Sequence, residues 1–309
     1  MPSDTLLISS WRSALYEHAK KFPFTAIGLT LALLALAGLL LQGLWLAITE
    51  EANISLRWAL MGGLAAFAAT SLGALPALAF KGISTRIEDS MLGFAAGMML
   101  AASSFSLILP GIEASTALMH TPIMGALVVV FGMALGVLLM LGLDQFTPHE
   151  HDKTGPCGPG HENCDRVLLF VFAIALHNLP EGMAIGVSFA QEDLNVGIPF
   201  TTAIALQDIP EGLAVALALI AAGFHRTTAV LIAIGTGLLE SVGALLGVTL
   251  SSGVPLAYPI GLGLSAGAMI FVVSHEVIPE THRNGHQTAA TLGLMVGFAL
   301  MMTLDTALG

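Results

Sequence analysis

Two polar segments interrupt long apolar stretches of this chain, and both contain residue types that bind metal ions. The first reads His-Asn-Leu-Pro-Glu-Gly from His177 to Gly182, and the second reads Gln-Asp-Ile-Pro-Glu-Gly from Gln207 to Gly212. On a helix, the first and fifth residues of each segment lie on one face. Imidazole, amide and carboxylate groups at this spacing can coordinate a divalent cation.

The composition indicates a membrane protein. Of the 309 residues, 55% are hydrophobic and only 10% are charged, and the mean hydropathy is +0.85. A soluble fold of this length could not bury so much apolar surface. The net charge of -11 argues against a nucleic acid partner. Two cysteines are too few for a disulfide framework.

Nine apolar stretches are long enough to cross a bilayer, which takes roughly 20 helical residues. They are expected at 24–48, 56–80, 91–112, 123–146, 167–190, 197–223, 228–250, 256–279 and 288–308. The expected fold is therefore all-α, a polytopic membrane helical bundle. Residues 1–55 would form an N-terminal cytoplasmic segment with an extra span, and 56–309 an eight-span domain. The start of the chain lacks the cleavage site of a signal peptide.

The positions of lysine and arginine predict a cytoplasmic N-terminus, because cytoplasmic loops retain these residues. With that orientation only Arg57 lies outside, and the inside residues are Arg12, Lys20, Lys21, Lys81, Arg86, Lys153, Arg166, Arg226 and Arg283. The outer face is acidic in the same topology. Its acids are Glu50, Glu51, Glu113, Glu192, Asp193 and Asp305.

The loop at 147–166 is the one long connection, and it lies on the expected cytoplasmic side. It contains His149, Glu150, His151, Cys157, His161, Glu162 and Cys164. Imidazoles, carboxylates and thiols together are typical of metal binding, although nearby prolines and glycines predict a flexible segment. A solvated linker and a transient metal-collecting loop both fit.

Four acids lie well inside predicted spans, namely Glu181, Asp208, Glu211 and Glu240. Each costs about 2.5–3.5 kcal/mol at the centre of a bilayer, so the four together cost roughly 10 kcal/mol. The fifth, sixth and seventh spans contain no Lys or Arg, so protons or a bound cation must neutralise these acids. The imidazole of His177 shifts the preference from Ca²⁺ or Mg²⁺ toward Zn²⁺. Met99 could add a thioether, with ordinary packing as the alternative.

The prolines and glycines of the two segments also have structural consequences. Pro180 and Pro210 lack an N–H, which leaves carbonyl oxygens four residues earlier without helical donors. Such oxygens are tolerated at membrane depth where they line a cavity. Gly182 and Gly212 predict close approach of neighbouring helices.

The paired Pro-Glu-Gly motifs, the His-containing loop before them, Glu240 and the His275-Glu276 pair resemble the ZIP family of divalent-metal transporters, in a prokaryotic form. The resemblance extends over the eight spans after the first. Two copies of the motif thirty positions apart in adjacent apolar spans are specific, whereas a lone His-x-x-x-Glu is weak. The extra N-terminal span departs from the eight-span family pattern, and Gln207 replaces a histidine found in many relatives.

The resemblance implies a binuclear centre near the membrane midplane. One site would use Met99, His177, Glu181, Gln207 and Glu211, and the second would use Asn178, Asp208 and Glu240 with Glu181 and Glu211 shared. The entry path would comprise Ser106, Glu113 and Asp305. The exit path would comprise Asp144, His149, His151, His275 and Glu276.

The resemblance also implies a fold and a mechanism. Three spans would recur as an inverted repeat around a central helix pair, and metal would move into the cytoplasm across a bacterial inner membrane by elevator-type alternating access. Zn²⁺ is the expected substrate, with Cd²⁺ or Fe²⁺ as further candidates, and no prosthetic group is expected. The expected partners are metal ions and the lipid bilayer, and a homodimer is a candidate assembly.

Two other classes and one variant remain open from the residues alone. A metal-selective channel could use the same carboxylates, and saturation of flux at low metal concentration would distinguish a carrier from it. An intramembrane metal-dependent hydrolase would need a motif such as His-Glu-x-x-His, which this chain lacks. A proton-coupled exchanger is the variant, since acids at this depth take up protons when no metal is bound.

Overall fold

The computed structural model describes residues 16–49, 54–79, 83–146, 149–151, 155–157, 178–192, 194–221, 224–251 and 254–308, with only the backbone described between 149 and 157. The α-helices are α2 (Pro23–Ile48), α3 (Ile54–Ala74), α4 (Thr85–Ala102), α5 (Leu109–Met119), α6 (Pro122–Phe146), α8 (Leu194–Ala221), α9 (Arg226–Leu250), α10 (Ala257–Val272), α11 (Ile278–Thr281) and α12 (Gln287–Leu308). Residues 178–188 are also helical. A short 3₁₀ helix, η1 (Leu75–Leu78), and two π-helical segments, η2 (Ser103–Ile108) and η4 (Val273–Val277), complete the helical elements.

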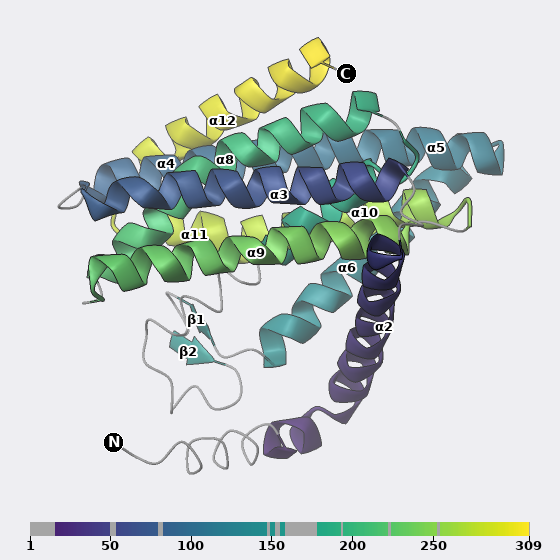
Figure 1. Ribbon diagram of the computed structural model, residues 1–309, viewed down its shortest axis with the longest axis horizontal. Helices are drawn as coiled ribbons and strands as arrows, with labels where there is room; N and C mark the ends of the chain where they lie inside the picture. The colour runs from purple at the N-terminus through teal and green to yellow at the C-terminus, as the bar shows by residue number, and fades with distance from the viewer. Residues whose placement is uncertain are drawn as a thin grey trace.

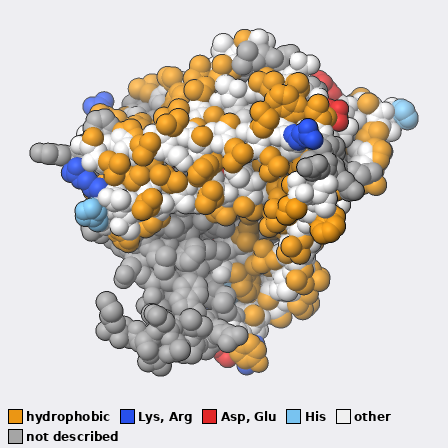
Figure 2. Space-filling model, viewed as in Figure 1, with side chains coloured by type: hydrophobic (Ala, Val, Ile, Leu, Met, Phe, Trp, Pro, Cys, Tyr) orange, Lys and Arg blue, Asp and Glu red, His pale blue; other side chains and the backbone are white. Residues whose placement is uncertain are grey.

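The predicted polytopic helical bundle is confirmed. Among the described residues, eight helical stretches are long and apolar enough to cross a membrane. The third runs over 85–119 and is longer than the 91–112 predicted, because α4 continues through η2 into α5. Part of the predicted fifth span, 167–177, lies outside the described residues. In Figure 2, hydrophobic side chains cover the middle of the visible face, while charged side chains lie toward its margins.

Two groups of helices form the bundle, as Figure 1 shows. The first helix group comprises α3, the helix at 178–188, α8 and α9, with α3 packed against both α8 and α9. The second helix group comprises α4, α6, α10 and α12, in which α4 packs along α12 and α6 along α10. Contacts between the two groups include α4 against α8 and Val187 of the helix at 178–188 against Gly261 of α10. The polar motifs of the sequence therefore lie in the first group.

Pairs of glycines four residues apart bring these helices into backbone contact. At each of these positions an added Cβ would overlap backbone atoms of the neighbouring helix. The pairs are Gly93/Gly97 on α4 against Gly293/Gly297 on α12, Gly132/Gly136 on α6 against Gly263/Gly267 on α10, and Gly182/Gly186 against Gly243/Gly247 on α9. Small residues of this kind are the usual basis of tight helix packing in membranes. The predicted close approach at Gly182 and Gly212 is confirmed.

The two π-helical segments have a common cause in the sequence. Each is followed by a helix whose second residue is proline, Pro110 in α5 and Pro279 in α11. A proline ring clashes with the carbonyl four residues back, which here belongs to Ser106 and His275. The helix relieves that clash by widening one turn. In α8, by contrast, Pro199 and Pro210 lie inside a continuous helix.

Helix α2 stands apart from the other spans and is steeply inclined to α3 and α9 in Figure 1. It contacts one helix of each group. Gly43 lies against Leu245 of α9, while Leu29 lies beside Gly142 of α6. The rest of α2 is largely exposed, as expected for a helix surrounded by lipid.

Part of the loop after α6 forms a hairpin that the sequence did not predict. Strands β1 (His149–His151) and β2 (Gly155–Cys157) pair antiparallel, and His149 pairs with Cys157. The flexibility predicted for the rest of the loop stays a prediction. The remaining polar residues of this loop lie outside the described part of the chain.

The glycine contacts generate a stability prediction. Replacing Gly97 with alanine should lower the thermal unfolding temperature in detergent, because its Cβ would overlap the carbonyl oxygen of Leu294. Overpacking of this kind costs about 1–3 kcal/mol. The matched control is Gly38→Ala in α2, where nothing lies within 4 Å of the new Cβ. Equal unfolding temperatures for the two variants would contradict the packing account.

Candidate metal centre

Three carboxylates converge inside the first helix group. Glu181 comes from the helix at 178–188, and Asp208 and Glu211 come from successive turns of α8. One oxygen from each lies within 4.8 Å of the others, which is close enough to share a metal ion. Glu181 is 0% exposed and Asp208 is 1% exposed. The predicted convergence of the two motifs is therefore present in the described residues.

A fourth acid, Glu240, approaches from α9. It is 1% exposed, and its Oε1 accepts a hydrogen bond of 2.7 Å from the Thr70 hydroxyl of α3. Glu240 lies close enough to Asp208 and Glu181 for their negative charges to repel one another. All members of the first helix group thus contribute a side chain to one small region.

The amides of the motifs complete the polar region. Gln207 is fully buried, and its Nε2 donates a hydrogen bond of 2.7 Å to Glu181 Oε1. Asn178 is also buried, at 2% exposure. Several buried oxygens have no hydrogen-bond partner among the described residues: Asn178 Oδ1, Glu181 Oε2, Gln207 Oε1, Asp208 Oδ1 and Oδ2, and Glu240 Oε2. Buried oxygens in this condition are costly unless a cation or a proton binds them.

Apart from Arg226, the first residue of α9, the helices that carry these acids contain no lysine or arginine to balance them. The sequence has no Lys or Arg over 178–221 or over 227–250. In place of an internal salt bridge, a divalent cation could bind several of the oxygens at once and offset their mutual repulsion. The arrangement suits a cation that enters and leaves.

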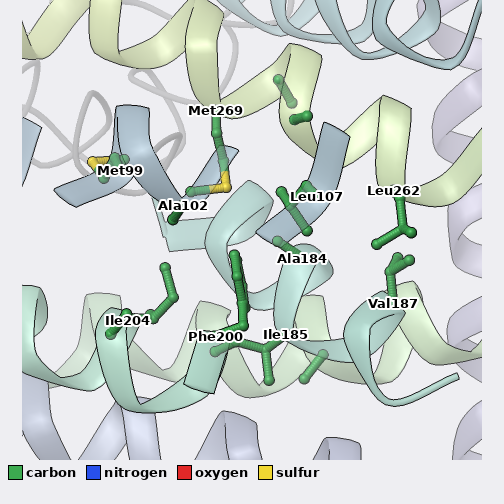
Figure 3. Packing of buried hydrophobic residues seen from close by; sticks show 14 of the residues in the cluster. Met99, Ala102, Leu107, Ala184, Ile185, Val187, Phe200, Ile204, Leu262 and Met269 are labelled. Atoms are coloured by element: carbon green, nitrogen blue, oxygen red, sulfur yellow. The ribbon is translucent and has the colours of Figure 1, made fainter. Parts of the chain in front are cut away.

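Two predicted ligands, Met99 and His177, are not among the described residues that the structure groups as ligands. Met99 belongs to α4 of the second helix group, where it is 1% exposed and packed in the hydrophobic cluster shown in Figure 3. His177 lies outside the described residues. Among the described residues, the polar region therefore consists of carboxylates, amides and the Thr70 hydroxyl.

A second set of ligand atoms lies at the predicted cytoplasmic end. Asp144 of α6 and the adjacent His275 and Glu276 of η4 each place one ligand atom within 4.8 Å of the others. His275 Nε2 lies 3.8 Å from Asp144 Oδ1, and the histidine side chain is 42% exposed. His149 and His151, also predicted for the exit path, follow α6 in strand β1.

The residues predicted for the entry path lie at the opposite end. Ser106 of η2 donates a hydrogen bond to Asp305 of α12, although the two are 199 positions apart. Ser106 is 3% exposed. Glu113 is exposed on α5, further toward the predicted outer surface. The structure thus joins two of these three residues directly.

Sequence reasoning missed two polar interactions. Thr70 gave no signal beyond a hydroxyl in an apolar span, yet it orients Glu240. Asp89 of α4 is 1% exposed and accepts hydrogen bonds from Asn284 at 3.0 Å and from His286 at 2.8 Å. A charged residue near the start of a span resembles an ordinary surface residue, so only the tertiary contact with the turn before α12 reveals its burial.

The contrast between Asp208 and Asp89 gives a prediction. In metal-free detergent solution, Asp208→Asn should raise the thermal unfolding temperature by a few degrees, because a neutral amide replaces a buried carboxyl group that must take up a proton when no metal is bound and whose oxygens lack partners among the described residues. Asp89→Asn should lower that temperature, since it weakens the bonds to Asn284 and His286. Added Zn²⁺ should stabilise the unaltered chain more than Asp208→Asn. Destabilisation by both substitutions would contradict this account.

Comparisons with known proteins identify the family of this chain. A model of the ZIP zinc transporter family matches residues 144–305. Zinc transporter ZIPB of Bordetella bronchiseptica is 59% identical over 309 residues, which covers 100% of both chains. Zinc transporter GufA of Myxococcus xanthus is 43% identical over 250 residues, covering 81% of this chain and 98% of that protein. Human zinc transporter ZIP11 is 29% identical over 343 aligned positions, covering 84% and 99%. This chain is a member of the ZIP family of zinc transporters.

Proposed function

We propose that this protein transports Zn²⁺ into the bacterial cytoplasm through a two-metal centre in the first helix group. The observation that carries the proposal is the convergence of Glu181, Asp208 and Glu211, with buried oxygens that lack partners among the described residues. Membership of the ZIP family supports zinc as the substrate. Cd²⁺ and Fe²⁺ are further substrates in this proposal, because oxygen and imidazole ligands accept them too.

The two metals would share Glu181 and Glu211 as bridging carboxylates. One metal would also use His177 and Gln207, with Met99 at its edge, and the other would use Asn178, Asp208 and Glu240. Shared carboxylates can hold two cations a few ångströms apart. The Gln207 amide already donates to Glu181, so binding through its oxygen would leave that donation intact.

The orientation follows from the basic residues. Arg86, Arg226 and Arg283 lie at the end of the bundle where α4 and α9 begin, and Arg57 lies near the start of α3 at the opposite end. Because basic residues are retained in the cytoplasm, the first end would be cytoplasmic. Metal would then enter past Glu113, Ser106 and Asp305. It would leave past Asp144, His275 and Glu276 toward His149 and His151 of β1.

The division into two helix groups supports an elevator-type mechanism. Glu181, Asp208, Glu211 and Glu240 belong to the first group, whereas both sets of mouth residues belong to the second group and the segments attached to it. Movement of the first group along the second would therefore expose the acids to one mouth at a time. A group that moves as one body keeps its ligands together during the movement.

Zinc flux into proteoliposomes tests the site. Glu181→Gln and Glu211→Gln should each reduce Zn²⁺ uptake by at least tenfold, because each removes a bridging carboxylate; even outer contacts to a metal site are worth about 10–100-fold. Glu17→Gln is the control, since Glu17 is an exposed acid that pairs with Lys20 far from the buried carboxylates. Full uptake by both site variants would show that these acids do not bind the transported metal. Saturation at low Zn²⁺ would favour a carrier over a channel.

Crosslinking tests the movement. Val187 of the first group lies 3.4 Å from an ideal Cβ at Gly261 of α10, and Figure 3 shows Val187 facing the neighbouring Leu262. A chain with Val187→Cys and Gly261→Cys, with Ser251→Ala to make room and the native cysteines replaced by serine, should lose uptake on oxidation. Reduction should restore it. Undiminished uptake by the fully crosslinked chain would exclude sliding of the two groups at this contact.

A further inference from the structure

One sequence pattern occurs twice in the second helix group. In α6, Gly132 and Gly136 are followed by Asp144, and in α12, Gly293 and Gly297 are followed by Asp305. Both copies have the spacing Gly-x₃-Gly-x₇-Asp. In both, the glycines lie against the backbone of a partner helix, α10 for α6 and α4 for α12. The two aspartates therefore occupy equivalent places in two equivalent helix pairs.

The partner helices repeat each other as well. Helix α4 ends in η2 before Pro110, and α10 ends in η4 before Pro279. Ser106 and His275 each precede the respective proline by four residues. Ser106 bonds to Asp305, and His275 faces Asp144. The Ser106–Asp305 and His275–Asp144 pairs are thus counterparts, located at opposite ends of the bundle.

The chemistry of the two counterparts differs. At the predicted cytoplasmic end, Asp144, His275 and Glu276 offer one nitrogen and two carboxylate oxygens for a metal. At the other end a hydroxyl replaces the imidazole, and the next residue is Leu107, which is 0% exposed in the hydrophobic cluster. Of the three ligand positions at the predicted cytoplasmic end, only the aspartate has a counterpart of the same type at the entry end, and that residue is Asp305. Its Oδ1 is already engaged by Ser106.

From these counterparts we infer that Ser106 determines how metal is handled at the entry mouth. Position 106 provides a hydroxyl to Asp305 where the other copy has an imidazole, so Asp305 lacks the neighbouring nitrogen ligand that would help it hold a transition metal. Metal passes the entry mouth without binding there, and it binds at the exit mouth before it is released. The inference rests on the proposed function for the direction of transport. The comparison of the Ser106–Asp305 and His275–Asp144 pairs does not depend on the buried acids.

The inference predicts that a ligand at position 106 completes a metal site with Asp305. Ser106→Cys is nearly isosteric and supplies a thiolate, and Ser106→His supplies the imidazole of the other copy. Both are tested in a chain with Glu181→Gln and Glu211→Gln and with Cys157 and Cys164 replaced by serine, so that neither the two bridging glutamates nor the native thiols contribute. Ser106→Cys should give the near-ultraviolet absorption of a Co²⁺–thiolate bond. Ser106→Ala in the same background is the control and should give none.

The dependence on Asp305 is the decisive measurement. Adding Asp305→Asn to Ser106→Cys should weaken Co²⁺ binding by at least about tenfold, in line with the usual cost of losing a metal-site contact. Ser106→His should bind one more Zn²⁺ per chain than Ser106→Ala. If both ligand variants remain folded by gel filtration and bind no additional metal, the inference is wrong. Because Glu181 and Glu211 are already replaced, this result is separate from the flux test of those two residues.

Discussion

Repulsion among the buried carboxylates of Glu181, Asp208, Glu211 and Glu240 is the interaction that the surrounding fold must withstand. These groups share a small volume, and the described residues around them provide only two hydrogen-bond donors, Gln207 to Glu181 and Thr70 to Glu240. A bundle held by loosely packed apolar side chains could separate to admit water. The acids therefore require a rigid environment of helices as well as a cation.

The glycine contacts supply that rigidity. Gly182, the residue after Glu181, lies against the backbone carbonyl of Glu240. The helix that carries Glu181 therefore contacts α9 at the position of Glu240 itself. Gly212 lies in the same way against Thr70, the residue that orients Glu240. The glycines that follow the glutamates of the two motifs are thus structural partners of the site. They fix the distance between helices from which the carboxylates project.

The sequence alone was sufficient for the bundle and for the choice of acids, because charge inside an apolar span is rare and costly. It could not reveal Thr70 as a partner of Glu240, since that contact depends on how α3 packs against α9. The π-helical segments were also missed, although Pro110 and Pro279 are visible in the sequence; prolines in α8 leave that helix continuous, so proline alone does not predict a widened turn. Met99 was a reasonable soft ligand by composition; it is buried in the hydrophobic cluster, and its role as a ligand stays a prediction.

Helix α2 has a mechanical consequence. Its contact at Gly43 is with α9, in the first helix group, and its contact at Leu29 is with α6, in the second. A displacement of one group along the other must either tilt this helix in the bilayer or break one of its two contacts. In the proposed movement, the lipid around α2 would resist or favour the displacement according to bilayer thickness. An otherwise peripheral helix would then couple the properties of the membrane to the position of the buried acids.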